Sequence, residues 1–196
     1  KNKYGLCGKL NLSAGLFTVL ITGGGFGVGP ITSLVKSLAH AGIRLQLLVV
    51  CGHNEKLKKR IDKLSLLSVG TEQCSVPTGG VSPVVRTYGF IDYVDELMEV
   101  SDAGITKPGG LISSEAIAKR MPLIIISPIP GQEGRNCAFL LRVKAAVRID
   151  KPADARRVIA DMSGNPGILS RMRGNIEGIR KEDPAGNIAR FVLERV

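Results

Sequence analysis

Short apolar segments of strand length alternate with helical segments along most of this sequence. Two of the clearest, FTVLIT at 17–22 and LIIIS at 123–127, are apolar at almost every position. Strands of that kind are buried on both faces, which is typical of a parallel sheet covered by helices on both sides. Right-handed crossovers then predict an α/β fold with a doubly wound, Rossmann-like parallel sheet. The expected strands are 17–22, 44–51, 84–89, 102–106, 123–127 and 145–149.

Apolar residues recur at helical spacing between these strands. The last three helical segments each begin with a proline, which suits a first helical turn. Residues 65–83 are rich in Ser, Thr, Gly and Pro, so an irregular excursion is expected there. The expected helices are 31–42, 55–64, 93–101, 111–119, 135–143, 152–162, 166–180 and 184–196.

The net charge of +10 favours anionic partners such as phosphates or lipid head groups. The densest basic run, 55–63, has mixed sign at helical spacing, and a solvated helix face is its simpler interpretation. Nucleic acid is not expected as a partner, because three tyrosines, five phenylalanines and no tryptophan offer few stacking platforms.

Four cysteines without a CxxC pair, together with only two histidines, argue against a zinc site. Scattered thiols suit a reducing, cytoplasmic compartment. The sequence starts at Lys1 rather than at methionine, which suggests a piece of a longer protein. We expect residues 1–16 to be the remnant of an interdomain linker and 17–196 to form the domain.

A glycine-rich loop, GGGFGVGP at 23–30, follows the first expected strand. It is not a dinucleotide fingerprint, because Pro30 stands at the last glycine position and no acid ends the second strand. It also lacks the Gly-Lys-Ser/Thr of a P-loop. Backbone N–H groups around Gly24, Gly25 and Gly27 can still approach an anion closely, which we favour over a plain tight turn.

A second loop, KPGG at 107–110, also leads into a helix. Gly109 frees the backbone there, so that the N–H groups of Gly110, Leu111 and Ile112 can face a phosphate. One turn further on, the carboxylate of Glu115 could accept hydrogen bonds from a vicinal diol such as a ribose. On its own, Glu115 is as well explained by favourable placement near the positive end of the helix dipole.

A third loop, PIPGQEGRN at 128–136, follows the expected strand 123–127. Two prolines and a glycine stop the strand, and Gln132 and Glu133 stand side by side in the turn. A turn does not need this pair. From the residues alone, the pair is either an exposed polar turn or a ligand contact.

Together, the three loops and the segment YGFIDYVDELMEVSDAGIT at 88–106 resemble the C-terminal half of the family 28 glycosyltransferases. The resemblance is greatest to the diacylglycerol glycosyltransferases, which include monogalactosyldiacylglycerol synthase, and weaker to the peptidoglycan-precursor N-acetylglucosaminyltransferase. It covers about 17–196 and is poorest at 65–83. The resemblance implies one half of a GT-B fold that holds a UDP-sugar, whereas the acceptor half is missing from this sequence.

The resemblance also assigns roles to residues. It implies that the backbone at Phe90 and Ile91 contacts uracil and that Glu115 binds the ribose. It implies that Gly110, Leu111 and Ile112 face the phosphates, and that Gln132 and Glu133 hold the donor sugar. The peptidoglycan enzyme has a serine where this chain has Gly25, so that phosphate contact must come from backbone. Lys107 is a candidate cation for the leaving UDP, although a surface lysine explains it nearly as well.

The implied reaction is direct transfer of a hexose from a UDP-sugar to a diacylglycerol-type acceptor, with neither a metal nor another cofactor. No catalytic base is assigned, because in this family it lies in the missing acceptor half. That half would also bind the lipid acceptor, and the last helix would pack across it. Peripheral association with anionic lipid at the cytoplasmic face of a membrane is expected as well.

Three other functions stay open. One is a transferase of the peptidoglycan-precursor type that uses UDP-GlcNAc. Another is a nucleotide-binding module without catalysis of its own. The third is a UDP-sugar epimerase of GT-B fold, which is disfavoured because His53 is the only histidine in a suitable loop.

Overall fold

Six parallel strands form one sheet in the computed structural model, which describes residues 3–69 and 83–195. Their order is β3-β2-β1-β4-β5-β6, so the chain winds outwards from β1 first in one direction and then in the other. This order is that of a doubly wound Rossmann sheet, and the predicted fold class is confirmed. The strands are β1 Phe17–Thr22, β2 Leu45–Val50, β3 Val84–Tyr88, β4 Ala103–Thr106, β5 Leu123–Ile126 and β6 Ala146–Ile149.

Helices follow each strand, close to the predicted positions. Two of the three prolines expected in a first turn do begin a helix, whereas α7 begins two residues after Pro152. The side chains of Asn165 and Asp183 accept hydrogen bonds from backbone N–H groups at the starts of α8 and α9. The helices are α1 Lys3–Lys9, α2 Ile31–Ala39, α3 Glu55–Val69, α4 Val94–Val100, α5 Gly110–Ala118, α6 Gln132–Arg142, α7 Asp154–Gly164, α8 Pro166–Glu177 and α9 Pro184–Leu193.

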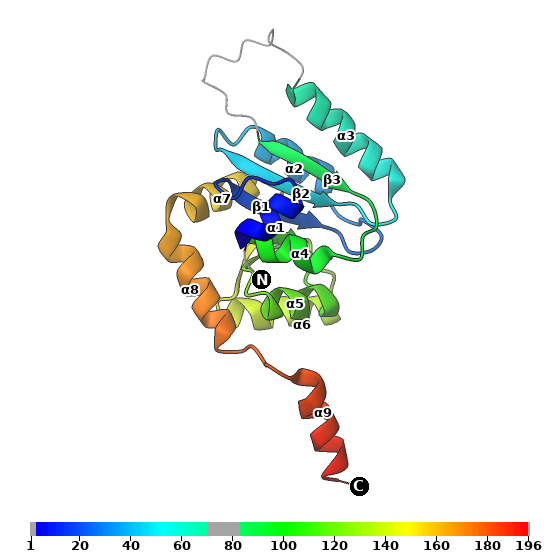
Figure 1. The fold of residues 1–196 in the computed structure, drawn as a ribbon, viewed down its shortest axis with the longest axis vertical. Helices are drawn as coiled ribbons and strands as arrows, with labels where there is room; N and C mark the ends of the chain where they lie inside the picture. Colours follow the sequence, from blue (N-terminus) through cyan, green and yellow to red (C-terminus); the bar gives the residue numbers. More distant parts are fainter. Residues whose placement is uncertain (1–2, 70–82, 196) are drawn as a thin grey trace.

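Both faces of the sheet are buried, as the continuously apolar strands predict. Successive residues of a strand point to opposite faces, so that Ile21 joins the core on one side of β1 and Leu20 the core on the other. Helices α2, α3 and α7 cover the first face, and α1, α4, α5 and α6 cover the second (Figure 1). Helix α8 reaches both, with Leu169 in the first core and Ile176 in the second.

Helix α1 was not predicted, since residues 1–16 are expected to be the remnant of a linker. Two glycines in KYGLCGK disfavour a helix. Burial of Leu6 and Cys7 against the second face outweighs that preference. The Lys3 ammonium also lies 2.9 Å from Asp102 Oδ1, and Asp102 Oδ2 accepts a hydrogen bond from the Thr18 N–H of β1. Whether this segment belongs to an interdomain linker stays a prediction.

Helix α3 is longer than predicted and ends at Val69. The prediction that the irregular excursion begins at Ser65 is therefore wrong. The Ser65 hydroxyl donates to the Asp62 carbonyl (2.7 Å), a local bond that a helix tolerates. The remainder of the predicted excursion, 70–82 with Cys74, lies outside the described residues.

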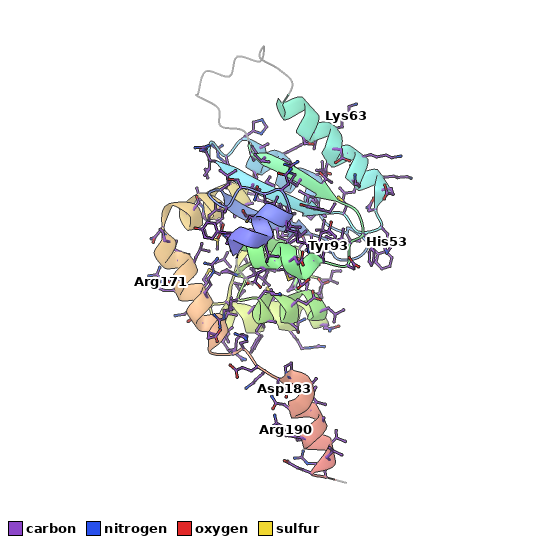
Figure 2. All side chains as sticks on the ribbon, in the orientation of Figure 1. His53, Lys63, Tyr93, Arg171, Asp183 and Arg190 are labelled. Carbon is purple, nitrogen blue, oxygen red and sulfur yellow. The ribbon has the colours of Figure 1, made fainter. Side chains whose placement is uncertain are left out.

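The C-terminal helix α9 stands away from the sheet, beyond a short connection to α8 (Figure 1). None of its residues is buried. It carries exposed apolar side chains as well as Arg190, which Figure 2 labels together with Asp183 at the start of the helix. The expectation that this helix packs across a further domain stays a prediction. The exposed apolar residues are Ile188, Phe191, Val192 and Leu193.

Candidate functional site

The strand order reverses between β1 and β4, which are neighbours at the centre of the sheet. The chain leaves β1 towards α2 on one face and leaves β4 towards α5 on the other. Diverging loops of this kind leave a crevice at the carboxyl ends of the strands, where open α/β sheets bind ligands. Two loops that the sequence singles out, 23–30 and 107–110, border this crevice.

The glycine loop interlocks with the loop that follows β2. The His53 N–H donates to the Gly25 carbonyl (2.9 Å). Gly27 and Gly52 both have a φ of 58°, and a Cβ at either would overlap a backbone oxygen of the opposite loop. Gly27 was predicted to bind an anion, but the structure places it in this loop-to-loop contact rather than in the pocket lining described below.

Replacing Gly52 with alanine is expected to destabilise the fold by about 1–3 kcal/mol, because strain at a left-handed residue adds to the overlap with the Gly25 carbonyl. Urea unfolding followed by circular dichroism would measure the loss. Gly25→Ala is the matched control, since Gly25 lacks a positive φ and a Cβ there meets no described atom within 4 Å. Equal stability of the two variants would contradict the interlocked geometry.

A pocket of about 630 Å³ opens between these loops, the residues after β3 and α5. This volume suits a small ligand. Glu115 is the sixth residue of α5 and lies beyond its first turn, where the helix dipole has little effect. Its place in the lining therefore favours a ligand contact over the dipole alternative. The lining includes these predicted residues: Gly24, Gly25, Phe90, Ile91, Gly109, Gly110, Leu111, Ile112 and Glu115.

A second pocket of about 280 Å³ adjoins the first, and the two share Gly24, Gly109 and Ile112. It brings Lys107 and Glu133 together in one lining. Lys107 has no ion-pair partner among the residues that the structure describes. A ligand that extends across both pockets would have Glu115 near one end and Glu133 near the other.

Helix α5 begins where the two pockets meet. Gly109 is its N-cap residue, and Ser113 is the first residue whose N–H bonds back, to the Gly109 carbonyl (3.1 Å). The preceding N–H groups, from 110 to 112, have no acceptor within the helix. Free N–H groups and the positive end of the helix dipole together favour an anion.

Asn136, which was not predicted as a site residue, fixes the loop before α5. Its amide nitrogen donates to the Pro108 carbonyl (2.9 Å) and so ties α6 to the 107–110 loop. A signal was present, because Asn136 closes the PIPGQEGRN motif one helical turn beyond Gln132.

Helix α6 begins at Gln132, so the prediction that it starts near Arg135 is wrong. The Glu133 carboxylate accepts a hydrogen bond from the Ile129 N–H (2.8 Å), which closes the turn. The Gln132 side chain reaches the start of α5, since a Cβ on Gly110 would lie 3.2 Å from its Nε2. Glu133 therefore stabilises its own turn and also lines the second pocket, whereas Gln132 lies beside the pockets.

Four further residues line the first pocket and were not predicted. Two of them end β1 and β2, one follows β2, and one begins α4. Because open α/β sheets bind ligands at the carboxyl ends of their strands, the first three could have been predicted. One of them also shapes the glycine loop, through a 3.2 Å hydrogen bond from the Gly24 N–H to the Thr22 hydroxyl. The residues are Thr22, Val50, Gly52 and Val94.

The cysteines in the described part of the chain are packing residues. Cys7, Cys51 and Cys137 are free and buried. Burial raises the pKa of the Cys51 thiol to about 11, with a further contribution from Asp62, so the thiol is neutral at pH 7. Within 3–69 and 83–195, no three His, Cys, Asp or Glu side chains cluster in a way that could hold a metal ion. The expectation that no metal is required stays a prediction.

The sequence is similar to those of known glycosyltransferases. The chain is 32% identical over 193 residues to a processive diacylglycerol β-glucosyltransferase of Bacillus mycoides, a match that covers 98% of this chain and 45% of that protein. The chain therefore spans about half the length of the curated relatives that it matches. No protein-family model matches the sequence.

Solved structures show the fold. MurG of Acinetobacter baumannii superposes with a TM-score of 0.70 at 16% identity, covering 99% of this chain and 53% of that one. The C-terminal CMP-Kdo binding domain of WaaA from the same organism superposes with a TM-score of 0.62 at 10% identity, covering 90% of this chain and 95% of that one. The chain is thus a homologue of the C-terminal half of the processive diacylglycerol β-glucosyltransferases and has the fold of a GT-B glycosyltransferase domain.

Proposed function

We propose that this chain is the donor-binding half of an enzyme that transfers a hexose from a UDP-sugar to a diacylglycerol-type acceptor. One observation carries the proposal: two adjoining pockets meet at the free N–H groups of α5, with Glu115 in one and Lys107 and Glu133 in the other. The names of the Bacillus relatives, which are diacylglycerol glucosyltransferases, support the same conclusion.

The two pockets suit the two ends of a nucleotide-sugar. In this proposal the uracil lies at Phe90 and Ile91, and the ribose hydroxyls donate to the Glu115 carboxylate. The diphosphate lies at the start of α5, where N–H groups are free of intrahelical bonds. The hexose then extends into the second pocket towards Glu133, with Gln132 beside it. A carboxylate and an amide together supply the acceptors and donors that sugar hydroxyls need.

The chemistry is a single displacement. An acceptor hydroxyl oxygen forms a bond to the anomeric carbon, and the bond from that carbon to the phosphate oxygen breaks, so that UDP leaves with the electron pair. The new charge lies on the diphosphate, beside the positive end of α5 and the Lys107 ammonium. Groups fixed in this way before the reaction stabilise the transition state without reorganisation. The base that takes the acceptor proton belongs to another part of the full-length protein.

The rim of the pockets suits an acceptor that carries hydrocarbon. Large apolar side chains are exposed on each of the loops that border the crevice. A lipid acceptor held by the other half of the protein would approach the anomeric carbon across this surface. The rim residues and their exposed fractions are Phe26 (77%), Val28 (53%), Phe90 (63%), Leu111 (83%) and Ile129 (54%).

A transfer assay with the full-length protein tests the proposal. UDP-glucose, UDP-galactose and UDP-GlcNAc are each supplied with diacylglycerol in detergent micelles, and the glycolipid is identified by mass spectrometry. We expect one of the hexose donors to give a glycosyl-diacylglycerol and free UDP. Transfer from UDP-GlcNAc to a peptidoglycan precursor instead would favour the peptidoglycan-type alternative. UDP binding without any transfer would favour a non-catalytic nucleotide-binding module.

Peripheral contact with an anionic membrane is part of the proposal, at the cytoplasmic face. Four cations on α3 are exposed and recur at positions i, i+3, i+4 and i+7, which places them on one face of the helix. Figure 2 labels Lys63 on this helix, which runs along the β3 edge of the sheet. No helix in the described part of the chain is long and apolar enough to cross a bilayer. The cations of this α3 face are Lys56, Lys59, Arg60 and Lys63.

Reversing three charges of the α3 face, with Lys56→Glu, Lys59→Glu and Lys63→Glu, is expected to lower the partition coefficient onto anionic vesicles roughly tenfold at 0.1 M salt. Vesicle sedimentation would measure it, with neutral phosphatidylcholine vesicles for comparison. The matched control reverses three exposed cations elsewhere: Lys36→Glu, Arg156→Glu and Arg171→Glu. An equal loss in the control would show that net charge alone acts, and equal adsorption to neutral vesicles would contradict the electrostatic account.

A further inference from the structure

Two aromatic rings stack at the mouth of the first pocket. The His53 and Phe90 rings lie 4.2 Å apart between centroids, with an angle of 15° between their planes. They come from the loops that follow β2 and β3, which are neighbouring strands. Figure 2 labels His53 beside the start of α3. Nothing in the sequence links the two residues, because one is in CGHN and the other in YGFI.

Both rings are exposed, but the backbone that carries His53 is held by contacts with the glycine loop. The backbone of His53 is fixed, because its N–H donates to the Gly25 carbonyl and the preceding Gly52 fits only against that loop. Asn54 then begins α3, and its side chain accepts a hydrogen bond from the Leu57 N–H (2.9 Å). The Phe90 ring is 63% exposed and lies outside both buried cores. The stack with His53 is the ring contact that the structure describes for Phe90.

Only one of the two rings borders the ligand space. Phe90 lines the first pocket, whereas His53 is not among its described lining residues. A ring without a fixed neighbour would exchange between rotamers and leave the pocket wall undefined. An aromatic pair of this geometry changes an equilibrium constant by about two- to tenfold.

We propose that His53 is a positioning residue that holds Phe90 as a wall of the nucleotide pocket. The inference rests on the proposed function, since the ligand is taken to be UDP. His53 acts through its flat ring, and its ability to carry a proton is not required. Another planar aromatic ring should replace it, whereas a small or flexible side chain should not.

Calorimetric titration with UDP tests the role of the ring. Relative to the unaltered chain, His53→Ala is expected to weaken UDP binding about three- to tenfold, and His53→Phe is expected to stay within about twofold. The matched control is His40→Ala, because His40 is the other histidine of the chain, is exposed on the end of α2 and is far from the pocket lining. Unchanged affinity in His53→Ala, or an equal loss in His53→Phe, would overturn the inference.

A double-mutant cycle distinguishes positioning of Phe90 by His53 from a general loss of structure. If His53 acts through Phe90, Phe90→Ala and His53→Ala should each weaken binding, and the double variant should lose little more than the larger single effect. Fully additive losses would contradict the proposed coupling. The melting temperatures of all variants should lie close to that of the unaltered chain, because both side chains are exposed.

A measurement without ligand keeps this inference separate from the proposed function. With only two histidines, the imidazole proton signals are readily assigned by comparing the His40→Ala and His53→Ala spectra. We expect the His53 ring protons to be shifted upfield by the Phe90 ring and to move towards the His40 position in Phe90→Ala. Absence of that shift would overturn the stack. An intact shift in a chain that fails to bind UDP would contradict the proposed function instead.

Discussion

Replacing Gln132 and Glu133 together with alanine is expected to lower the turnover of the full-length enzyme by about 100-fold, while its affinity for UDP changes less than twofold. Both residues lie in the first turn of α6, next to the second pocket, which in the proposed function holds the hexose and not the nucleotide. Their loss should leave the anomeric carbon poorly positioned, and misplacement by about 1 Å can cost about two orders of magnitude in rate. Steady-state kinetics with saturating UDP-sugar, together with UDP titration, would measure both quantities.

Loss of turnover in this variant could also come from lost stability, because Glu133 has a structural role. The Glu133 carboxylate closes its own turn through the Ile129 N–H, so alanine removes a stabilising bond as well as a sugar contact. Asp154→Ala is the matched control, because Asp154 lies in the first turn of α7 and accepts a similar bond from the Lys151 N–H (3.2 Å). Both variants should lose comparable thermal stability, and only the first should lose turnover. Normal turnover in the Gln132 and Glu133 variant would show that the motif is only a turn.

Replacing Glu115 with glutamine is expected to weaken UDP binding by about tenfold or more. A hydrogen bond to a charged group contributes about 1.5–3 kcal/mol, and the amide is a weaker acceptor that offers one oxygen instead of two. Because Glu115 is exposed and lies beyond the first turn of α5, its loss should leave the melting temperature nearly unchanged. Calorimetry and thermal unfolding of the same samples would measure both effects.

Glu182→Gln is the control for net charge, since Glu182 is exposed in the connection between α8 and α9. It should bind UDP as the unaltered chain does. If Glu115→Gln lost thermal stability and kept its affinity for UDP, Glu115 would act on the helix dipole rather than on the ribose. The position of Glu115 beyond the first turn already disfavours that outcome.

The sheet could be predicted from the sequence because its strands carry a strong and local signal. Runs such as FTVLIT and LIII are apolar on both faces, and only a buried parallel sheet accommodates them. The carboxyl-end rule then places the loops after the strands at one edge. The structure indeed brings residues as distant in sequence as Gly24, Phe90 and Glu115 into one lining.

Two helices were predicted wrongly or not at all, and each case has a local cause. Gly134 disfavours a helix at 132–135, yet α6 starts at Gln132, with its first intrahelical bond from the Arg135 N–H to the carbonyl of the N-cap residue Gly131 (3.1 Å). The glycines of α1 were misleading in the same way, since burial of Leu6 and Cys7 decides that segment. Propensity is a weak prior that tertiary contacts override.

Contacts between loops could not be predicted from the sequence. The bond from Asn136 to Pro108 and the stack of His53 on Phe90 each join segments from neighbouring strands. Their geometry depends on strand order and register, and neither follows from spacing along the chain. Gly27 shows the same limit, because a glycine that permits close packing of two loops looks in sequence like one that admits a phosphate.

Calorimetric titration of this chain with UDP and with NADH decides whether the crevice at the β1–β4 reversal is a UDP site. We expect saturable binding of UDP at one site per chain and a response to NADH no greater than dilution heat. Adding the correct UDP-hexose should give at least the affinity of UDP, because the second pocket adjoins the first. Binding of NADH without any response to UDP would show that the crevice is not a UDP site.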